Sequence, residues 1–231
     1  MSISETIRTR LKSSGVRFFA NDNIADWLNE GEHEQLITEL TQKFEGVLDA
    51  LIIDRENDPN SRGTPKRLAK MYIQELMQGR FVEAPPVTAF PNDDVETRYG
   101  GMITVRVELM SMCSHHHQIV KGVAYIGLLP SMKVIGLSKY ARIAQWCARR
   151  GTLQEELTRQ IADEIEKHTG ARDLAVYVQA EHGCCTNRGI MATSSLTQTT
   201  ELRGQFFNPS VKNEFLDYIK MQQQHSQRTV F

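Results

Sequence analysis

The sequence has few cysteines and no long apolar run, and both features narrow the class of protein. Four cysteines in 231 residues are too few for a disulfide scaffold, so we expect reduced thiols or metal ligands. No stretch of about 18 apolar residues occurs, which predicts no transmembrane helix. The N-terminal stretch is mixed and polar, without the apolar segment of a secretion signal. Together these absences predict a cytoplasmic protein that does not bind membranes.

The sequence also lacks an excess of charge of either sign. Lysine and arginine total 27 and aspartate and glutamate total 28, so the formal net charge is −1. This balance argues against a protein that coats nucleic acid and against a polybasic membrane binder. Neither a GxxxxGK[ST] motif nor a GxGxxG motif is present, so P-loop and Rossmann phosphate sites are not indicated.

Helical periodicity dominates the N-terminal part, after a loosely patterned polar stretch over residues 1–31. Apolar residues recur at steps of three and four over residues 34–51, which predicts a helix. Residues 54–63 are polar and contain proline and glycine, which is typical of a loop. A second helix is predicted to begin with Thr64 as N-cap and a proline at its first position, and to end at Gly79.

The apolar period changes from helical to alternating after residue 101. In chain order we predict strands near 103–109 and 119–129, helices over 138–149 and 152–168 with Gly170 as C-cap, strands near 174–178 and 190–207, and a helix around 215–219. Strands adjacent in sequence favour antiparallel pairing, so the predicted fold class is α+β. We predict an N-terminal helical region with a connector over residues 1–100 and a second domain over 101–231.

Two clusters of metal-ligating side chains follow two of the predicted strands. The first is Cys-Ser-His-His-His at 113–117, and the second is Glu-His-Gly-Cys-Cys at 181–185. One Cys and one His from the first cluster, together with one Cys from the second, would give zinc three protein ligands. Three protein ligands leave the fourth zinc position for water, which is the catalytic arrangement. A closed structural site that uses both His182 and Cys184 is the alternative, and a buried core thiol is the plainer interpretation for Cys147. Surplus histidines could be acid–base groups.

Basic and acidic residues elsewhere could bind a nucleotide. The basic candidates are Lys139 and Arg142 on one helix face, Arg67 and Lys70 on another, and Arg188 after the second cluster. Such side chains suit phosphate oxygens, although a solvated helix face is the plainer interpretation for any one of them. Gln154 and Glu155 begin a predicted helix. The carboxylate of Glu155 either interacts favourably with the helix dipole or accepts hydrogen bonds from the two adjacent N–H groups of a guanine edge.

Taken together, these motifs resemble the zinc-dependent GTP cyclohydrolase I family over roughly residues 64–207. The matching stretches are TPKRLAKMYIQEL (64–76), CSHHH (113–117), GVAYIGLLPSMKVIGLSKYARIAQWCARR (122–150), LQEELTRQI (153–161) and EHGCCTNRGI (181–190). The resemblance implies the tunnelling fold, an antiparallel four-stranded sheet with two helices between strand pairs. It also implies a homo-oligomer, a decamer of two pentamers, in which the sheets join into a barrel and the sites lie between subunits.

The resemblance further implies a role for each site residue. Zinc would be held by Cys113, His116 and Cys184, and the catalytic residues would be His115, His182 and Gln154. The substrate-binding residues would be Ser138, Lys139, Arg142, Gln154, Glu155 and Arg188, with Arg67 and Lys70 from a neighbouring subunit. The implied reaction is hydrolysis of GTP at C8 by zinc-bound water, giving 7,8-dihydroneopterin triphosphate and formate.

Ser114 departs from the family pattern, which usually has an acidic residue there. The change removes no proposed ligand or base, so activity is still expected. One alternative is a related tunnelling-fold enzyme that acts on another guanine nucleotide or a deazaguanine, such as the nitrile reductase of queuosine biosynthesis. Another is a catalytically inactive, zinc-bound oligomer. The presence of His115, His182 and Glu155 together argues against an inactive scaffold, which needs none of them.

Overall fold

The computed structural model describes residues 1–228, with side chains through residue 224, so the last three residues of the predicted second domain lie outside it. The chain divides into two compact units, Met1–Glu83 with Arg149–Gly151, and Ala84–Ala148 with Thr152–Phe231. Within the described residues, none of the helices combines the length and apolar character that a membrane span requires.

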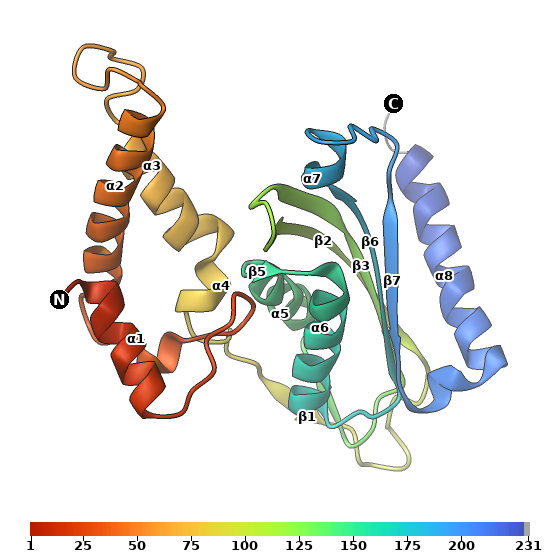
Figure 1. The fold of residues 1–231 in the computed structure, drawn as a ribbon. Helices are drawn as coiled ribbons and strands as arrows, with labels where there is room; N and C mark the ends of the chain where they lie inside the picture. Colours follow the sequence, from red (N-terminus) through yellow and green to blue (C-terminus); the bar gives the residue numbers. More distant parts are fainter. Residues whose placement is uncertain (229–231) are drawn as a thin grey trace. The chain divides into compact units, whose positions relative to one another are not determined.

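The first unit is helical (Figure 1). Its elements are α1 (Ile3–Ser13), the 3-10 turn η1 (Ala25–Trp27), α2 (Glu32–Ala50), α3 (Thr64–Lys70), the π-helical segment η2 (Met71–Leu76) and α4 (Gln78–Phe81). A small apolar cluster centred on Ile7, Leu11 and Ile24 forms its core. Arg10 of α1 donates to both carboxylate oxygens of Glu32, at 2.6 and 2.8 Å, and this ion pair fastens α1 to the start of α2.

Helix α1 was not predicted, because the apolar pattern of residues 1–31 is weak. Its start is set by polar chemistry. The Ser2 hydroxyl accepts from the Glu5 amide, and the Glu5 carboxylate accepts from the Ser2 amide, which is a capping box. The Ser-x-x-Glu spacing is visible in the sequence, and it is the signal that indicates this helix.

Two details predicted for the second helix are wrong. The residue that caps α3 is Gly63, and Thr64 is already the first helical residue. The helix does not end at Gly79, which is buried inside α4. Its hydrogen-bond ladder changes to the π type over Met71–Leu76, so the chain reaches α4 after only a one-residue break at Met77.

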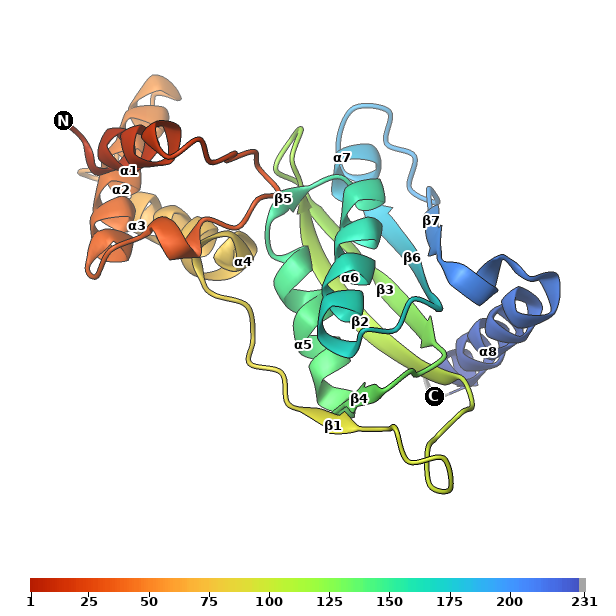
Figure 2. The same ribbon diagram turned by 90° about the horizontal axis from the view of Figure 1, so that it is seen from below.

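The second unit is an antiparallel sheet with helices on both faces (Figures 1 and 2). Its strand order is β5-β2-β3-β6-β7, and β1 pairs with β4 in a separate two-stranded sheet. The strands are β1 (Ala89–Pro91), β2 (Ile103–Cys113), β3 (Ile119–Leu128), β4 (Lys133–Ile135), β5 (Gly151–Thr152), β6 (Leu174–His182) and β7 (Thr197–Leu202). The helices are α5 (Leu137–Ala148), α6 (Gln154–Thr169), α7 (Gly183–Thr186), the 3-10 turn η3 (Gly204–Phe207) and α8 (Pro209–Arg228). The predicted α+β class is confirmed.

Alternation along the strands gives this sheet two apolar faces. Helices α5 and α6 cover one face, where Ile126, Ile143 and Ile161 are fully buried. Cys147 belongs to this core, as predicted. Helix α8 covers the other face, where it packs Phe215 against the sheet. The fourth strand is shorter than the predicted 190–207, because only Thr197–Leu202 pairs with β6.

The register of the sheet brings the ends of β2 and β6 to one edge. Met112 pairs with Ile119 across β2 and β3, and Val120 pairs with His182 across β3 and β6. Because β2 and β6 are both antiparallel to β3, they run in the same direction. The two sequence clusters, which follow β2 and β6, therefore meet at this edge.

Candidate metal and catalytic site

A Cys-His-Cys group lies at the edge of the sheet where β2 and β6 end. The thiols of Cys113 and Cys184 and one imidazole nitrogen of His116 all lie within 4.8 Å of one another. Cys113 is buried at the end of β2, His116 is exposed in the following turn, and Cys184 is half-buried in α7. The structure thus brings together the three predicted ligands from two segments about 70 residues apart in the sequence.

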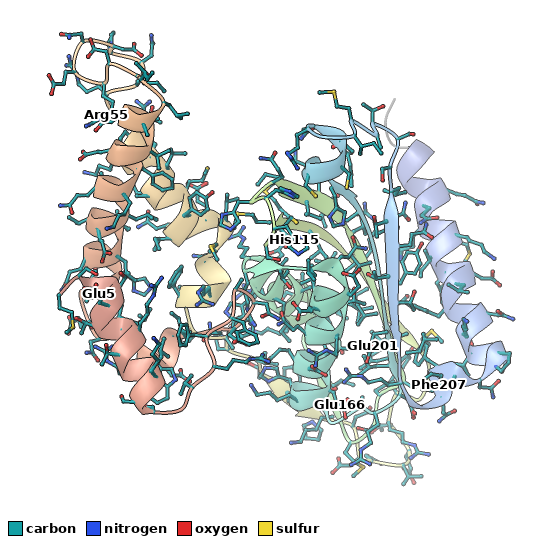
Figure 3. All side chains as sticks on the ribbon, viewed as in Figure 1. Glu5, Arg55, His115, Glu166, Glu201 and Phe207 are labelled. Carbon is teal, nitrogen blue, oxygen red and sulfur yellow. The ribbon has the colours of Figure 1, made fainter. Side chains whose placement is uncertain are left out.

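A tight turn between β2 and β3 presents the histidines. The Cys113 amide donates to the Gln118 carbonyl at 2.9 Å, and the His117 amide donates back to the Cys113 carbonyl at 2.9 Å. His117 adopts a left-handed φ of 52°, which closes the turn. The rings of His115 and His116 are edge to face with centroids 6.3 Å apart, and both are exposed. Figure 3 labels His115.

The donor set of this group fits a zinc ion. In a tetrahedral zinc site with Zn–S bonds of about 2.3 Å, two thiolates stand about 3.8 Å apart, which the observed spacing accommodates. Burial and the neighbouring thiols of Cys113 and Cys185 raise the pKa of Cys184 to about 11. A bound cation would reverse that shift, because it stabilises the thiolate. Three protein ligands leave a position open, as in catalytic zinc sites.

His182 lies beside this group, at the last residue of β6. Its Nε2 is 2.7 Å from Oε1 of Gln154, which is only 4% exposed at the start of α6. Burial lowers the pKa of His182, and the nearby carboxylate of Glu155 opposes that shift in part. Glu155 itself is exposed in the first turn of α6. His182 thus lies two residues before Cys184, and Glu155 is close enough to His182 to affect its pKa.

Three of the predicted phosphate-pocket residues lie elsewhere in the same unit. Ser138, Lys139 and Arg142 occupy the first two turns of α5, which starts after β4. The end of α5 leads through β5 to Gln154 at the metal-ligand edge, so its start lies at the other end of the sheet (Figure 2). A helix of 12 residues spans about 18 Å. Within one chain, the structure does not bring these three residues to the metal-ligand group.

The other predicted cations belong to different segments. Arg188 is exposed in the segment just after α7, close in sequence to Cys184. Arg67 and Lys70 lie in α3 of the first unit. In the described part of the chain, none of Lys139, Arg142 and Arg188 forms an ion pair with an acidic side chain.

Two further residues near the site were not predicted from the sequence. Thr158 lies one helical turn after Gln154, is 2% exposed, and is hydrogen-bonded to Thr199 of β7 at 2.6 Å. The signal for Thr158 is a polar residue placed next to Leu157 on an otherwise apolar helix stripe. Thr199 carries no such signal, because its neighbours on β7 from Thr197 to Glu201 are also polar.

Comparison with known proteins identifies a family that this chain matches over most of its length. The family model described as GTP cyclohydrolase I matches residues 40–220. That range includes every residue of the metal-ligand group, together with His182, Gln154 and Glu155.

Curated relatives match over most of their length. The GTP cyclohydrolase 1 of Flavobacterium johnsoniae is 37% identical over 193 residues, covering 83% of this chain and 85% of the relative. The GTP cyclohydrolase 1 of Pseudoalteromonas translucida is 40% identical over 189 residues, covering 79% of this chain and 98% of the relative. The solved structure of the archaeosine synthase QueF-Like has a TM-score of 0.38 and 13% identity over 45% of this chain and 93% of its own. From the family model and the curated relatives, the chain belongs to the GTP cyclohydrolase I family.

Proposed function

We propose that this chain hydrolyses GTP at C8 of the guanine, giving 7,8-dihydroneopterin triphosphate and formate. The observation that carries the proposal is the convergence of Cys113, His116 and Cys184 at one sheet edge, beside His182 and Glu155. The relatives named GTP cyclohydrolase 1 support the same reaction. The reaction consumes water, opens the imidazole ring of guanine, and releases C8 as formate.

Zinc is the proposed metal, held by Cys113, His116 and Cys184. When bound, it would supply Lewis acidity that lowers the pKa of water towards neutrality. Both thiols must lose their protons to act as ligands, so metal binding releases protons. His116 must be neutral for the same reason. Cys113 is buried and His116 is exposed, so substrate would approach this group from the side of His116.

His182 and Glu155 are proposed to hold the guanine. A carboxylate that accepts from two adjacent N–H groups matches the N1 and 2-amino edge of guanine, and Glu155 is exposed for that contact. His182 is proposed to pass a proton to a ring nitrogen of the guanine, and its lowered pKa makes its protonated form a stronger acid. His115 is proposed as the second acid–base residue, acting on the ribose as its ring opens. It is exposed in the β2–β3 turn.

The triphosphate is proposed to bind Lys139, Arg142 and Arg188, with Ser138 in the same pocket. Because the start of α5 lies at the other end of the sheet from Cys184, a single copy cannot supply all of these contacts around one GTP. We therefore infer that the site is completed by a neighbouring copy, as in the proposed decamer with the tunnelling-fold barrel. Arg67 and Lys70 would also come from another copy.

Ser114 is proposed to leave the chemistry intact. It is half-buried in the turn between the ligands Cys113 and His116. A neutral residue in place of a carboxylate makes the surroundings of the metal less negative. We therefore expect Ser114→Glu to change metal affinity more than it changes the identity of the product.

Turnover of GTP by the zinc-loaded protein tests the proposal. The dihydropterin is followed by its absorbance and formate is quantified in the same samples, and we expect the two to form in equal amounts. No turnover by fully zinc-loaded protein would refute the proposal and favour an inactive zinc-bound oligomer.

Matched variants separate the roles in the site. Cys184→Ala should lose both zinc and turnover, whereas the adjacent Cys185→Ala should keep both, since Cys185 is outside the ligand group. His182→Ala should abolish turnover and keep zinc bound. Loss of zinc from His182→Ala would instead indicate a closed structural site in which His182 is a ligand.

A further inference from the structure

The side chain of Gln154 is fully engaged by the protein. Its Nε2 lies 3.1 Å from the carbonyl oxygen of Val178, 3.1 Å from the carbonyl oxygen of Thr197 and 3.1 Å from Oγ1 of Thr199. Its Oε1 lies 2.7 Å from Nε2 of His182. The residue is 4% exposed. Contact between this amide and a guanine base would require breaking several of these bonds.

The orientation of the amide is fixed by what its neighbours can do. Backbone carbonyls accept hydrogen bonds and cannot donate them. A flipped amide would therefore point its oxygen at two carbonyl oxygens 3.1 Å away, those of Val178 and Thr197, with no proton between them. The NH₂ group of Gln154 must face the carbonyls, so its oxygen must face His182.

Two threonine hydroxyls impose the same orientation independently. Thr158 Oγ1 donates a hydrogen bond to the backbone carbonyl oxygen of Gln154 at 2.7 Å, because a carbonyl oxygen can only accept. Its single proton is then used, so in the 2.6 Å contact between the hydroxyls Thr199 must donate to Thr158. Thr199 in turn has no proton left for Gln154 and accepts from its NH₂ group. All three hydrogen bonds of this threonine circuit (Thr199 to Thr158, Thr158 to the Gln154 backbone, and the Gln154 side chain to Thr199) can form together only when the side-chain nitrogen of Gln154 faces Thr199.

The orientation of the Gln154 amide determines which nitrogen of His182 carries a hydrogen. An amide oxygen only accepts, so Nε2 of His182 must be the donor in the 2.7 Å bond. We propose that Gln154, held in place by Thr199 and Thr158, is a positioning residue that fixes a hydrogen on Nε2 of His182, so that Nδ1 is the nitrogen that exchanges a proton with the substrate. Nδ1 has no hydrogen-bond partner among the described residues. This inference rests on the proposed function only for the identity of the substrate.

A split between kcat and KM tests the positioning role. Gln154→Met keeps most of the side-chain volume and removes the acceptor, so kcat for GTP should fall by about tenfold or more while KM changes by less than about twofold. Glu155→Gln, at the exposed neighbour, should instead raise KM. A rise in KM for Gln154→Met as large as its fall in kcat would assign the amide to the substrate and overturn the proposal.

Thr199→Val provides a second variant that is less disruptive to folding. It removes one hydroxyl but keeps the shape and both carbonyl partners of Gln154, so we expect kcat to fall by about fivefold, with KM unchanged. Thr200→Val, on the opposite face of β7, is the matched control and should leave both constants unchanged. Equal behaviour of the two variants would contradict the threonine circuit.

A spectroscopic measurement tests the tautomer without requiring turnover. Long-range ¹H–¹⁵N correlation of ¹⁵N-histidine in the zinc-loaded protein reports which nitrogen of a neutral ring carries hydrogen, and the His182 signals are identified by their absence in His182→Ala. We expect hydrogen on Nε2 in the wild type and a mixture of tautomers in Gln154→Met. Hydrogen on Nδ1 in the wild type would overturn the inference even in a protein that hydrolyses GTP, and hydrogen on Nε2 would support it even in one that does not.

Discussion

Gly122 of β3 is a position at which an added methyl group would disturb both the sheet and the metal-ligand edge. A Cβ there would lie 2.3 Å from the Gln179 carbonyl oxygen and 2.5 Å from the Ala180 Cβ, both on β6. Ordinary contacts between such atoms are about 3.5–4.0 Å, so the two strands would have to separate by more than about 1 Å. That separation would occur two residues from the Val120–His182 pair that aligns the site.

The cost of Gly122→Ala follows from that geometry. Overpacking against side chains typically costs about 1–3 kcal/mol, and here the obstacle is the backbone of a hydrogen-bonded strand, so we expect about 3 kcal/mol or more. For a unit of this size that corresponds to a Tm lower by about 6–12 °C. Because the neighbouring ligand positions move with the strands, zinc occupancy should fall as well.

Thermal unfolding followed by circular dichroism, with zinc content measured on the same preparations, checks this prediction. In Gly127→Ala, on the same strand, the added Cβ would lie 2.6 Å from the ring of Phe215, a side chain of α8. Because a side chain can move more easily than a paired strand, this variant should lower the Tm by less than Gly122→Ala does and should keep zinc bound. Gly46→Ala, with nothing within 4 Å in the exposed interior of α2, should stabilise the first unit by about 0.5–1 kcal/mol. A wild-type Tm with full zinc in Gly122→Ala would refute the close approach of β3 and β6.

Three further predictions concern stability. Ser2→Ala should cost about 1 kcal/mol and speed hydrogen exchange at the amides of α1, because it removes the capping box. Arg10 holds the pKa of Glu32 below its ordinary value of 4.5, so this ion pair stabilises the first unit above that pH and its contribution is lost as the pH falls through the lowered pKa. Glu32→Gln should flatten the pH dependence of unfolding in that acidic range. Phe215→Ala should cost about 3–5 kcal/mol in denaturant unfolding, since its ring is 1% exposed and packs edge to face on Phe206 at 5.6 Å.

The metal-ligand group is the part of the site that the sequence predicts best. Cys113 and His116 follow one alternating strand and Cys184 follows another, so antiparallel pairing through an intervening strand is enough to bring them together. The α+β class follows from the same alternation. The ends of helices were less predictable, because they depend on single capping interactions such as the Ser2–Glu5 box and on the π-helical segment after Lys70.

The environment of Gln154 could not be read from the sequence. Its hydrogen-bond partners come from β6 and β7, 24 to 45 residues further along the chain, and they include two backbone carbonyls that no residue type specifies. The position of Ser138 relative to Cys184 could not be predicted from the sequence for a similar reason. A motif gives the types and spacing of residues, whereas the direction of α5 between the strands decides which end of the sheet they reach.

The origin of the released carbon tests the central claim most directly. GTP labelled with ¹³C at C8 is incubated with the zinc-loaded protein, and the products are followed by ¹³C NMR. The account predicts that the label leaves entirely as formate, in step with the appearance of unlabelled dihydropterin triphosphate. Label retained in the pterin, or GTP that stays intact on fully zinc-loaded protein, would contradict it.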